Sequence, residues 1–523
     1  MTDISRSSEP FEALVRDTGS PERLHELAGM KLARGDAAGA IDLYRQCITF
    51  APHNAAIHNN FGVALLKAGR FSEAICAFET AGALQPGYVR ALVNLGKALR
   101  ELGRPSESLI RLREALDIEP DYVPALINLG DACAALGDLA AAERALERAA
   151  ELAPKQVEAH MTLGIVRLQA GRAAPALESL RTAIDLSPEH ADAHSNLAHA
   201  LFCAGDWQAA WPHFEYRFRR SAHRAGLKAP PGMPRWDGTA STEIELWLLG
   251  EQGLGDQLQF ARYALLLRER GMRCVIACNP RLAKIFSLAP LGARVVPAEA
   301  AADSSVDAAA ARWVPLMSLP AWHATRPDTV PAAGGYLAAD PRRISAWRER
   351  LSAPGLCVAL AWSGNPDAET GRYAGRSPPL SALAPLMRVP GVSFFSLQHG
   401  PAEEQIRKVP FGDSIRRLPG LDVGSDAFLD TAAALKCVDL LVTSDSAIAH
   451  LAGALGVPCW LCLMREPDWR WMRSGDTTPW YSSVRLFRQP APGDWQSVFR
   501  SAAAALELEA GRNPPAGQCA PRP

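Results

Sequence analysis

The sequence has almost no net charge, because 55 lysine and arginine residues stand against 56 aspartate and glutamate residues among 523. A protein that binds nucleic acid in general needs a strongly basic face to neutralise phosphates. This composition does not predict such a face, although it leaves room for a local basic pocket that binds one phosphate group. Nucleic acid is therefore not expected among the partners.

Long apolar runs are also absent. A membrane-spanning helix needs about 20 consecutive apolar residues, and no stretch approaches that length. The first ten residues are polar and lack the apolar centre of a secretory signal. We therefore expect no membrane span and a cytoplasmic location.

Cysteine is scattered, with eleven residues that lie mostly on apolar faces. An odd number without regular spacing argues against a disulfide framework and favours a reducing compartment. One Cys-x-x-Cys pair, Cys459 and Cys462, lies in an apolar run, and no second pair accompanies it. We interpret this pair as part of a buried strand, and we expect neither a metal ion nor a cofactor.

The sequence does contain a repeat of 34 residues over about residues 21–220. Five classes of residue recur in phase: a glycine, a proline, a second glycine, a small residue and a bulky residue. Their members are Gly35, Gly69, Gly103, Gly137, Gly171 and Gly205; Pro52, Pro86, Pro120, Pro154 and Pro188; Gly62, Gly96, Gly130 and Gly164, followed by Ala198; Ala40, Ala74, Ser108, Ala142, Ala176 and Ala210; and Tyr44, Phe78, Leu112, Leu146, Leu180 and Phe214.

Each series has a physical task in a hairpin of two helices. The Gly35 series ends the first helix in a left-handed turn, and the proline series ends the second helix. The Gly62 and Ala40 series let helices cross closely, and the Tyr44 series fills the groove between hairpins. The pattern resembles the tetratricopeptide repeat and predicts an α-solenoid of six repeats over residues 21–222, after a polar segment 1–20.

The resemblance implies an extended array whose concave face binds a peptide or protein partner. The alternative is a spacer or a dimerisation surface. Asparagines recur on the first helices and either bond the backbone of a peptide or are solvated; they are Asn60, Asn94, Asn128 and Asn196. The sixth hairpin is rich in aromatic residues, which predicts that it docks on the domain after a linker at residues 223–242.

From residue 243 onward, apolar strand patterns alternate with helical ones. Strands are expected at 243–249, 273–277, 293–296, 312–316, 356–362, 392–397, 440–443 and 458–463. The alternation favours parallel sheets covered by helices, which bind ligands at the carboxyl ends of the strands. We predict two doubly wound domains, at 243–352 and 353–510, and a disordered tail at 511–523.

The first strand leads into Gly250-x-x-Gly253-x-Gly255-Asp256, where glycines let a ligand approach the backbone. The spacing differs from the G-x-G-x-x-G of dinucleotide binders, so a Rossmann oxidoreductase is disfavoured. Asp256 either caps the following helix or acts as a general base.

A second motif, at residues 443–452, joins a strand to a tightly packed helix. Free amides at the start of that helix suit a diphosphate, and Ser446 adds a hydroxyl. Asp445 either caps the helix or accepts a hydrogen bond from a sugar. His450 is either a core residue or faces the ligand.

Arginines and aromatic residues supply further candidates. Arg372 and Arg376 either neutralise a leaving diphosphate or form a solvated pair. Four aromatic residues either stack on a base or sugar or pack the loop that carries them; they are Trp469, Trp471, Trp480 and Tyr481.

Residues 243–505 resemble glycosyltransferase family 9, the bacterial heptosyltransferases, and most closely bacterial proteins in which tetratricopeptide repeats precede such a domain. The resemblance is carried by D-S-A-x-x-H-L-A-G-A-L-G-x-P, from Asp445 to Pro458, and by Gly255-Asp256. Further shared segments are Trp362–Pro366, Arg376-Ser377, Ser396–Gln398, Asp430-Thr431, Pro467–Trp471 and Leu486–Gln489.

The resemblance implies a GT-B fold and an inverting, metal-independent transfer from a nucleotide-sugar, which is a co-substrate. Asp256 is implied as the catalytic base. The donor-binding residues that it implies are Gly253, Gly255, Asn365, Arg372, Arg376, Gln398, Asp445, Ser446, Ala447 and His450.

The sequence departs from the family in an acidic loop at residues 367–371, in His399 in place of a commoner lysine, and in Ala447 in place of glycine. The donor therefore need not be ADP-heptose. The acceptor is either a protein recruited by the repeats or a glycan such as lipopolysaccharide. The alternative function is a non-catalytic scaffold that carries a degenerate transferase-like domain.

Overall fold

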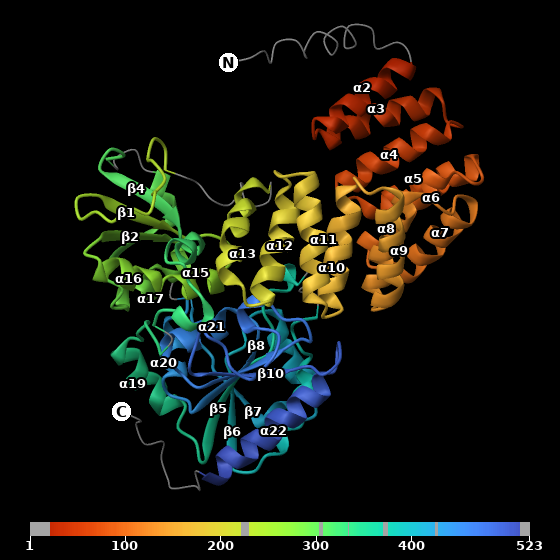
Figure 1. The fold of residues 1–523 in the computed structure, drawn as a ribbon. Helices are drawn as coiled ribbons and strands as arrows, with labels where there is room; N and C mark the ends of the chain where they lie inside the picture. Colours follow the sequence, from red (N-terminus) through yellow and green to blue (C-terminus); the bar gives the residue numbers. More distant parts are fainter. Residues whose placement is uncertain are drawn as a thin grey trace. The chain divides into compact units, whose positions relative to one another are not determined.

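The computed structural model describes residues 21–220, 230–302, 307–332, 334–369, 375–423 and 427–512 (Figure 1). The expected polar segment 1–20, Arg372 and most of the expected tail lie outside these residues. The chain divides into two compact units, Met1–Asn196 and Leu197–Pro523.

The first unit consists of helices that pair in sequence into hairpins. They are α2 (Pro21–Ala33), α3 (Ala37–Phe50), α4 (Ala55–Lys67), α5 (Phe71–Leu84), α6 (Val89–Glu101), α7 (Pro105–Ile118), α8 (Val123–Ala135), α9 (Leu139–Leu152), α10 (Val157–Gln169) and α11 (Ala173–Leu186). A sixth hairpin follows, α12 (Ala191–Cys203) and α13 (Trp207–Phe214), which lies mostly in the second unit. The predicted solenoid of six hairpins is confirmed.

Glycine has two separate tasks in each hairpin. The Gly35 series has φ between +73° and +87°, the left-handed conformation expected where the first helix ends. The Gly62 series lies directly under the bulky side chain of the same hairpin. For example, a Cβ on Gly130 would lie 2.5 Å from Cγ of Leu146. Each bulky residue therefore packs against the glycine of its own hairpin, while its place in the groove between hairpins stays a prediction.

The asparagines of the first helices bond to one another and to backbone. Asn94 donates to Asn59 on the preceding first helix (2.9 Å), and Asn59 donates to Asn60 (3.1 Å). Asn128 donates to the carbonyl of Pro124 (2.8 Å). The Asn94–Asn59 bond joins two successive hairpins, the other two lie within single helices, and both predicted roles of the asparagines stay open.

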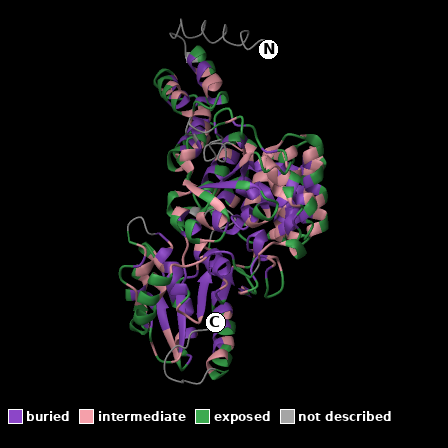
Figure 2. Ribbon diagram, turned by 90° about the vertical axis from the view of Figure 1, so that its left-hand side faces the viewer, coloured by how far each residue is buried: buried purple, intermediate pink, exposed green. Residues whose placement is uncertain are grey.

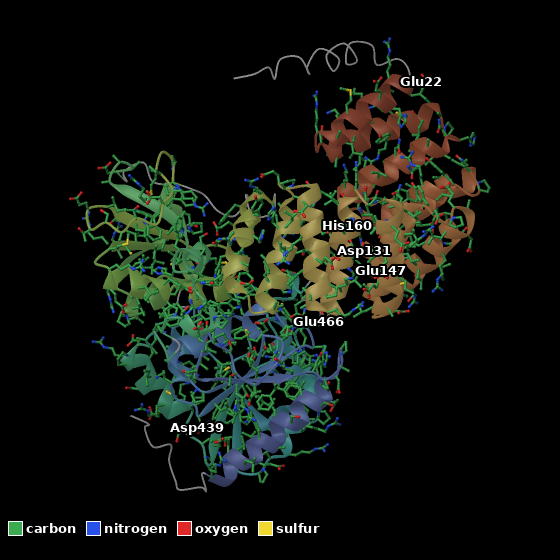
Figure 3. All side chains as sticks on the ribbon, in the orientation of Figure 1. Glu22, Asp131, Glu147, His160, Asp439 and Glu466 are labelled. Carbon is green, nitrogen blue, oxygen red and sulfur yellow. The ribbon has the colours of Figure 1, made fainter. Side chains whose placement is uncertain are left out.

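Charged residues reinforce the middle of the array, where Figure 3 labels three of the side chains. Glu147 accepts from Arg167 across the α9–α10 pair (2.8 Å), and Asp131 lies 3.6 Å from Arg100. His160 donates through Nε2 to the carbonyl of Pro154 (2.9 Å).

The second unit contains two parallel sheets among its described residues. The first has the order β3-β2-β1-β4, formed by β1 (Glu245–Leu249), β2 (Arg273–Cys278), β3 (Ala293–Pro297) and β4 (Ala311–Pro315). The second has the order β10-β9-β8-β5-β6-β7, formed by β5 (Leu356–Ala361), β6 (Val392–Ser396), β7 (Ile415–Arg417), β8 (Leu440–Ser444), β9 (Cys459–Leu463) and β10 (Val484–Arg488). The predicted parallel sheets are confirmed.

Helices connect the strands. They are α15 (Leu254–Phe260), α16 (Tyr263–Glu269), α17 (Pro280–Leu288), α18 (Leu319–Trp322), α19 (Pro341–Arg350), α20 (Leu429–Leu435), α21 (Ala447–Leu455) and α22 (Trp495–Arg512). The segment after β1 forms two helices, which are separated by residues 261–262, and Pro401–Lys408 is a 3-10 helix. Strands β7 and β10 were not predicted: β7 has only three residues, and β10 carries two arginines among five residues.

Burial is most complete in the central strands (Figure 2). Every residue of β5, β8 and β9 is buried, as expected for parallel strands covered on both faces. Trp495, Phe499 and Leu506 of α22 pack into the core of the larger sheet. This rigid sheet fixes where the loops at its carboxyl edge begin.

Candidate functional site

The loop after β1 carries Asp256 at the third position of α15. Its Oδ2 accepts a hydrogen bond from the backbone N–H of Gly253, the residue that precedes the helix (3.0 Å). The N-cap residue is therefore Gly253 and not Asp256, which instead bonds back to the start of the helix from its third position. The Asp256 side chain is 20% exposed.

Arg470 holds the other oxygen of Asp256. Its Nη2 lies 2.6 Å from Asp256 Oδ1, its Nη1 lies 2.8 Å from Asp468, and its Nε donates to Gln259 (2.8 Å). Arg470 was not among the residues predicted for the site. Arg470 lies in Pro467–Trp471, a segment shared with the family, and this position in the sequence is the signal that could have identified it.

Gly255 brings the β1 loop against the second sheet's α21. A Cβ on Gly255 would lie 2.8 Å from Cδ2 of His450 and 3.5 Å from Cα of Ala447. Helices α15 and α21 are in contact along this line. The absence of a side chain at Gly255 is therefore what allows the two predicted motifs to meet.

His450 is buried beneath this contact. Its Nδ1 lies 3.0 Å from the hydroxyl of Tyr481, and its ring lies against Trp471. Burial, together with the charge of Arg470, lowers the pKa of His450 to about 3, so the ring is neutral in ordinary buffers. Its surroundings are those of a core residue, while a contact with ligand remains a prediction.

Asp445 and Ser446 form the turn between β8 and α21. Burial and the charge of Asp468 raise the pKa of Asp445 to about 6, against the opposing effects of Trp471, Arg376 and Arg470. The Ser446 hydroxyl donates to the carbonyl of Ser444 (3.3 Å), and Ser446 is the residue that precedes α21.

Arg376 lies close to the start of α21. A Cβ on Gly364 would lie 3.4 Å from Arg376 Nη2 and 3.6 Å from Cβ of Ser446, so the three residues are neighbours. Arg376 Nε lies 3.9 Å from Glu369, which belongs to the acidic loop. Arg376 therefore lies beside the start of α21, and its contact with a diphosphate stays a prediction.

Asn365 and Gln398 have local bonds instead. Asn365 accepts from the N–H of Asp367 (3.2 Å). The side-chain oxygen of Gln398 accepts from the N–H groups of Trp362 (2.9 Å) and Ser363 (2.8 Å), and its nitrogen donates to two carbonyls. These amides shape the loops at the ends of β5 and β6, and their contact with a donor remains a prediction.

The aromatic residues of the loop after β9 are packed. Trp469 stacks on Phe202 of α12 (4.1 Å between ring centroids), and Trp480 stacks on Trp207 of α13 (5.2 Å). Trp471 and Tyr481 are also buried. The packing alternative is the one these contacts support, and the expected docking of the sixth hairpin is confirmed.

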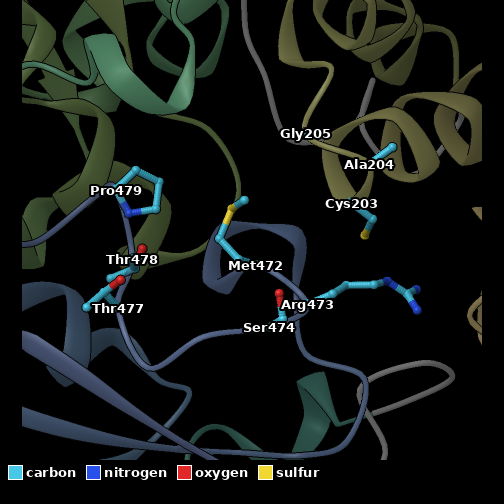
Figure 4. A pocket seen from close by; sticks show the side chains of 9 residues that line it. All are labelled: Cys203, Ala204, Gly205, Met472, Arg473, Ser474, Thr477, Thr478 and Pro479. Carbon is cyan, nitrogen blue, oxygen red and sulfur yellow. The ribbon is translucent and has the colours of Figure 1, made fainter.

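A pocket of about 560 Å³ lies beside this loop (Figure 4). It is lined by Cys203, Ala204, Gly205, Met472, Arg473, Ser474, Thr477, Thr478 and Pro479. It includes no residue predicted for the site, and we therefore place the candidate site at Asp256 and α21, where the charged groups converge. Among the described residues, no group of three or more histidine, cysteine or acidic side chains is arranged to hold a metal ion.

Comparison with known proteins establishes the repeats. Residues 31–75 and 99–164 match one tetratricopeptide repeat family, and residues 59–123 and 161–218 match another. The chain carries tetratricopeptide repeats, and both matches lie before the two sheets.

Two curated proteins are similar to the chain. It is 31% identical to Protein FlbA of Caulobacter vibrioides over 337 residues, which cover 59% of this chain and 54% of FlbA. It is 35% identical to the TPR repeat-containing protein PA4299 of Pseudomonas aeruginosa over 82 residues, 16% of this chain and 34% of that protein. The chain thus spans about half of FlbA and a third of PA4299.

Among solved structures, TTC0263, a thermophilic TPR protein in Thermus thermophilus, is 24% identical, with a TM-score of 0.33. The match covers 35% of this chain and 99% of TTC0263. In the part of the chain that the structure describes, no helix combines the length and apolar character needed to cross a bilayer.

Proposed function

We propose that the second unit is a glycosyltransferase of GT-B type, which moves a sugar from a nucleotide-sugar to a protein or glycan acceptor. The observation that carries the proposal is the contact of Gly255 with His450. It brings the Asp256 loop, at the carboxyl end of β1, against the amino end of α21, at the carboxyl end of β8. Ligands of doubly wound proteins bind at such strand ends.

In the proposed reaction, Asp256 accepts the proton of an acceptor hydroxyl while that oxygen attacks the anomeric carbon. The bond from the anomeric carbon to the phosphate oxygen breaks, and the nucleoside diphosphate leaves with the electron pair. The backbone amides at the start of α21, the Ser446 hydroxyl and Arg376 stabilise the charge that develops on it. A single displacement of this kind inverts the anomeric centre.

The pairing of Asp256 with Arg470 is compatible with its role as a base. A carboxylate has about four acceptor positions, and the capping bond and the ion pair leave others for the acceptor hydroxyl. The acceptor is a lipopolysaccharide or other glycan, or a protein that the repeats recruit. Tetratricopeptide arrays present a concave face for partners of this kind.

We expect one class of nucleotide-sugar to stabilise the full chain against thermal unfolding, because a ligand that binds only the folded state raises its stability. The screen uses UDP-, GDP-, ADP-, dTDP- and CMP-sugars, of which the first four carry the diphosphate that leaves in the proposed reaction. Asp256→Asn should retain that shift but lose donor turnover, since an amide cannot accept the proton. Arg376→Ala should lose the shift.

A second candidate function is a non-catalytic scaffold, which the established repeats favour. It predicts that none of the five nucleotide-sugar classes shifts the unfolding temperature of well-folded protein. Equal loss of binding and turnover in Asp256→Asn would contradict the assignment of Asp256 as the base.

A further inference from the structure

Arg470 has three hydrogen-bonding partners and two aromatic neighbours in the site. Besides Asp256, Asp468 and Gln259, its guanidinium lies over the rings of Trp469 (4.8 Å) and Phe260 (5.6 Å). Its side chain is only 9% exposed. A guanidinium with three separate acceptors and two aromatic neighbours has one available orientation, and that orientation presents Nη2 to Asp256.

The segment that carries Arg470 rests on the sixth helical hairpin. Trp469 is stacked on Phe202 of α12 and meets Trp207 and Trp211 of α13 edge-on. A second connection lies beyond the hairpin, where the buried Arg217 forms an ion pair with Glu251 of the β1 loop (2.7 Å). The end of the repeat array thus contacts both segments that meet at Asp256.

We propose that Arg470 is a positioning residue for Asp256, and that the sixth hairpin sets its place through the stacking of Phe202 on Trp469. The proposal rests on the proposed function, because it assigns what orients the base of that reaction. The last hairpin of the repeats is then a structural component of the transfer site, in addition to any part in binding partners.

The charges around Asp256 determine in which direction its pKa changes when Arg470 is replaced. Burial raises the pKa of Asp256, and the charge of Arg470 opposes that rise, while Asp468 and Glu251 add to it. The neighbouring His450 is neutral and adds no charge. Removing the Arg470 charge therefore raises the pKa of Asp256 further. Since the reaction needs the carboxylate, the loss of activity in acid should begin at a higher pH.

The experiment measures release of nucleoside diphosphate by the full chain between about pH 5 and 9. For Arg470→Gln we expect kcat to fall about 100-fold, because the Asp256 carboxylate is no longer held in the orientation that the reaction needs. The acid limb of the kcat profile should move up by about one pH unit or more. The KM for the donor should stay within about twofold, since Arg470 bonds the base and not the donor.

Arg470→Lys separates charge from geometry. It should restore the acid limb towards that of the wild type and leave kcat reduced, because an ammonium lacks the planar fork. Phe202→Leu should lower kcat with unchanged donor KM. Arg473→Gln makes the same charge change three residues along the loop, and should leave both kcat and the acid limb unchanged.

A wild-type acid limb in Arg470→Gln, with Asp256→Asn inactive, would overturn the role of Arg470 and leave the transferase standing. Unchanged kcat in Phe202→Leu would remove the hairpin from the proposal. Wild-type protein that turns over no donor contradicts the proposed function itself. Thermal unfolding of each variant shows whether it folds. If Arg470→Gln does not fold, the kcat of Arg470→Lys still tests whether the geometry of the guanidinium matters.

Discussion

At the residue scale, three aspartates of the site interact electrostatically with arginines. They are Asp256, Asp445 and Asp468, and the arginines are Arg376 and Arg470. Asp256 and Asp468 share Arg470, whereas Asp445 has no guanidinium at ion-pair distance among the described contacts. Asp445 is half-buried, and Asp468 and Trp471 of the loop after β9 both act on its carboxyl. A partly buried acid beside another carboxylate keeps its proton to a higher pH than an exposed one, and its titration should therefore change the stability of the protein with pH.

We predict that Asp445→Asn stabilises the protein above about pH 6 and has no effect below about pH 4. In the wild type the folded state binds the proton more tightly than the unfolded state, because the pKa of Asp445 is raised from 3.8 to about 6. Its contribution to stability is therefore present in acid and is lost as the pH rises through 6. The gain for the amide should be on the order of 2 kcal/mol.

Denaturant unfolding at several pH values checks this prediction. Asp413→Asn, at an exposed position of the same unit, is the matched control and should change little at any pH. A stability gain for Asp445→Asn that is the same at pH 4 and pH 8 would mean that the carboxyl is not the titrating group.

At the element scale, the two helices of a repeat hairpin pack closely because the first helix has a glycine where they cross. The Gly130 position lies against Leu146, and the equivalent glycines lie against the equivalent bulky residues. By contrast, Gly82 of α5 has no atom within 4 Å of its Cβ position. Two helical glycines of the same array therefore differ in the reason for their presence.

We predict opposite effects for alanine at these two glycines. Gly130→Ala should destabilise the first unit by about 1–3 kcal/mol, because the added methyl group overlaps Leu146. Gly82→Ala should stabilise it by up to about 1 kcal/mol, because alanine favours the helix and meets nothing. Urea unfolding measures both. Equal destabilisation by the two variants would contradict the packing explanation.

At the scale of the whole molecule, contacts divide the chain inside the sixth hairpin, at residues 196–197. The 34-residue period instead continues to about residue 220. The hairpin therefore belongs to the repeats by its sequence pattern and mostly to the second unit by its contacts. Three contacts hold it within the second unit: the stacking of Phe202 on Trp469, the bond from Trp211 Nε1 to the carbonyl of Thr325 (2.9 Å) and the Arg217–Glu251 pair.

We predict that a fragment beginning at residue 197 is more stable than one beginning at residue 223. The shorter fragment leaves Glu251 buried without Arg217, a loss that typically costs about 3–5 kcal/mol. It also exposes the faces of Trp469 and Trp480. Thermal unfolding of the two purified fragments gives the comparison, and equal unfolding temperatures would contradict this view of the hairpin.

The sequence by itself determined the repeats and the alternation of strands with helices. Both are periodic patterns that local sterics and burial impose on the residues themselves, as with Gly35 in its left-handed turn and the all-apolar β5. It also indicated Asp256, Arg376 and the turn before α21, because glycines and charged residues that follow an apolar strand pattern can be recognised from the sequence alone.

Only the tertiary structure decided how those motifs meet. The contact of Gly255 with His450, the pairing of Arg470 with Asp256 and the stacking of Phe202 on Trp469 join residues about 200 or more positions apart in the chain. Such contacts depend on shape and burial summed over the whole fold. No local pattern records them, because each residue of a pair is compatible with many partners until the sheets have brought one of them near.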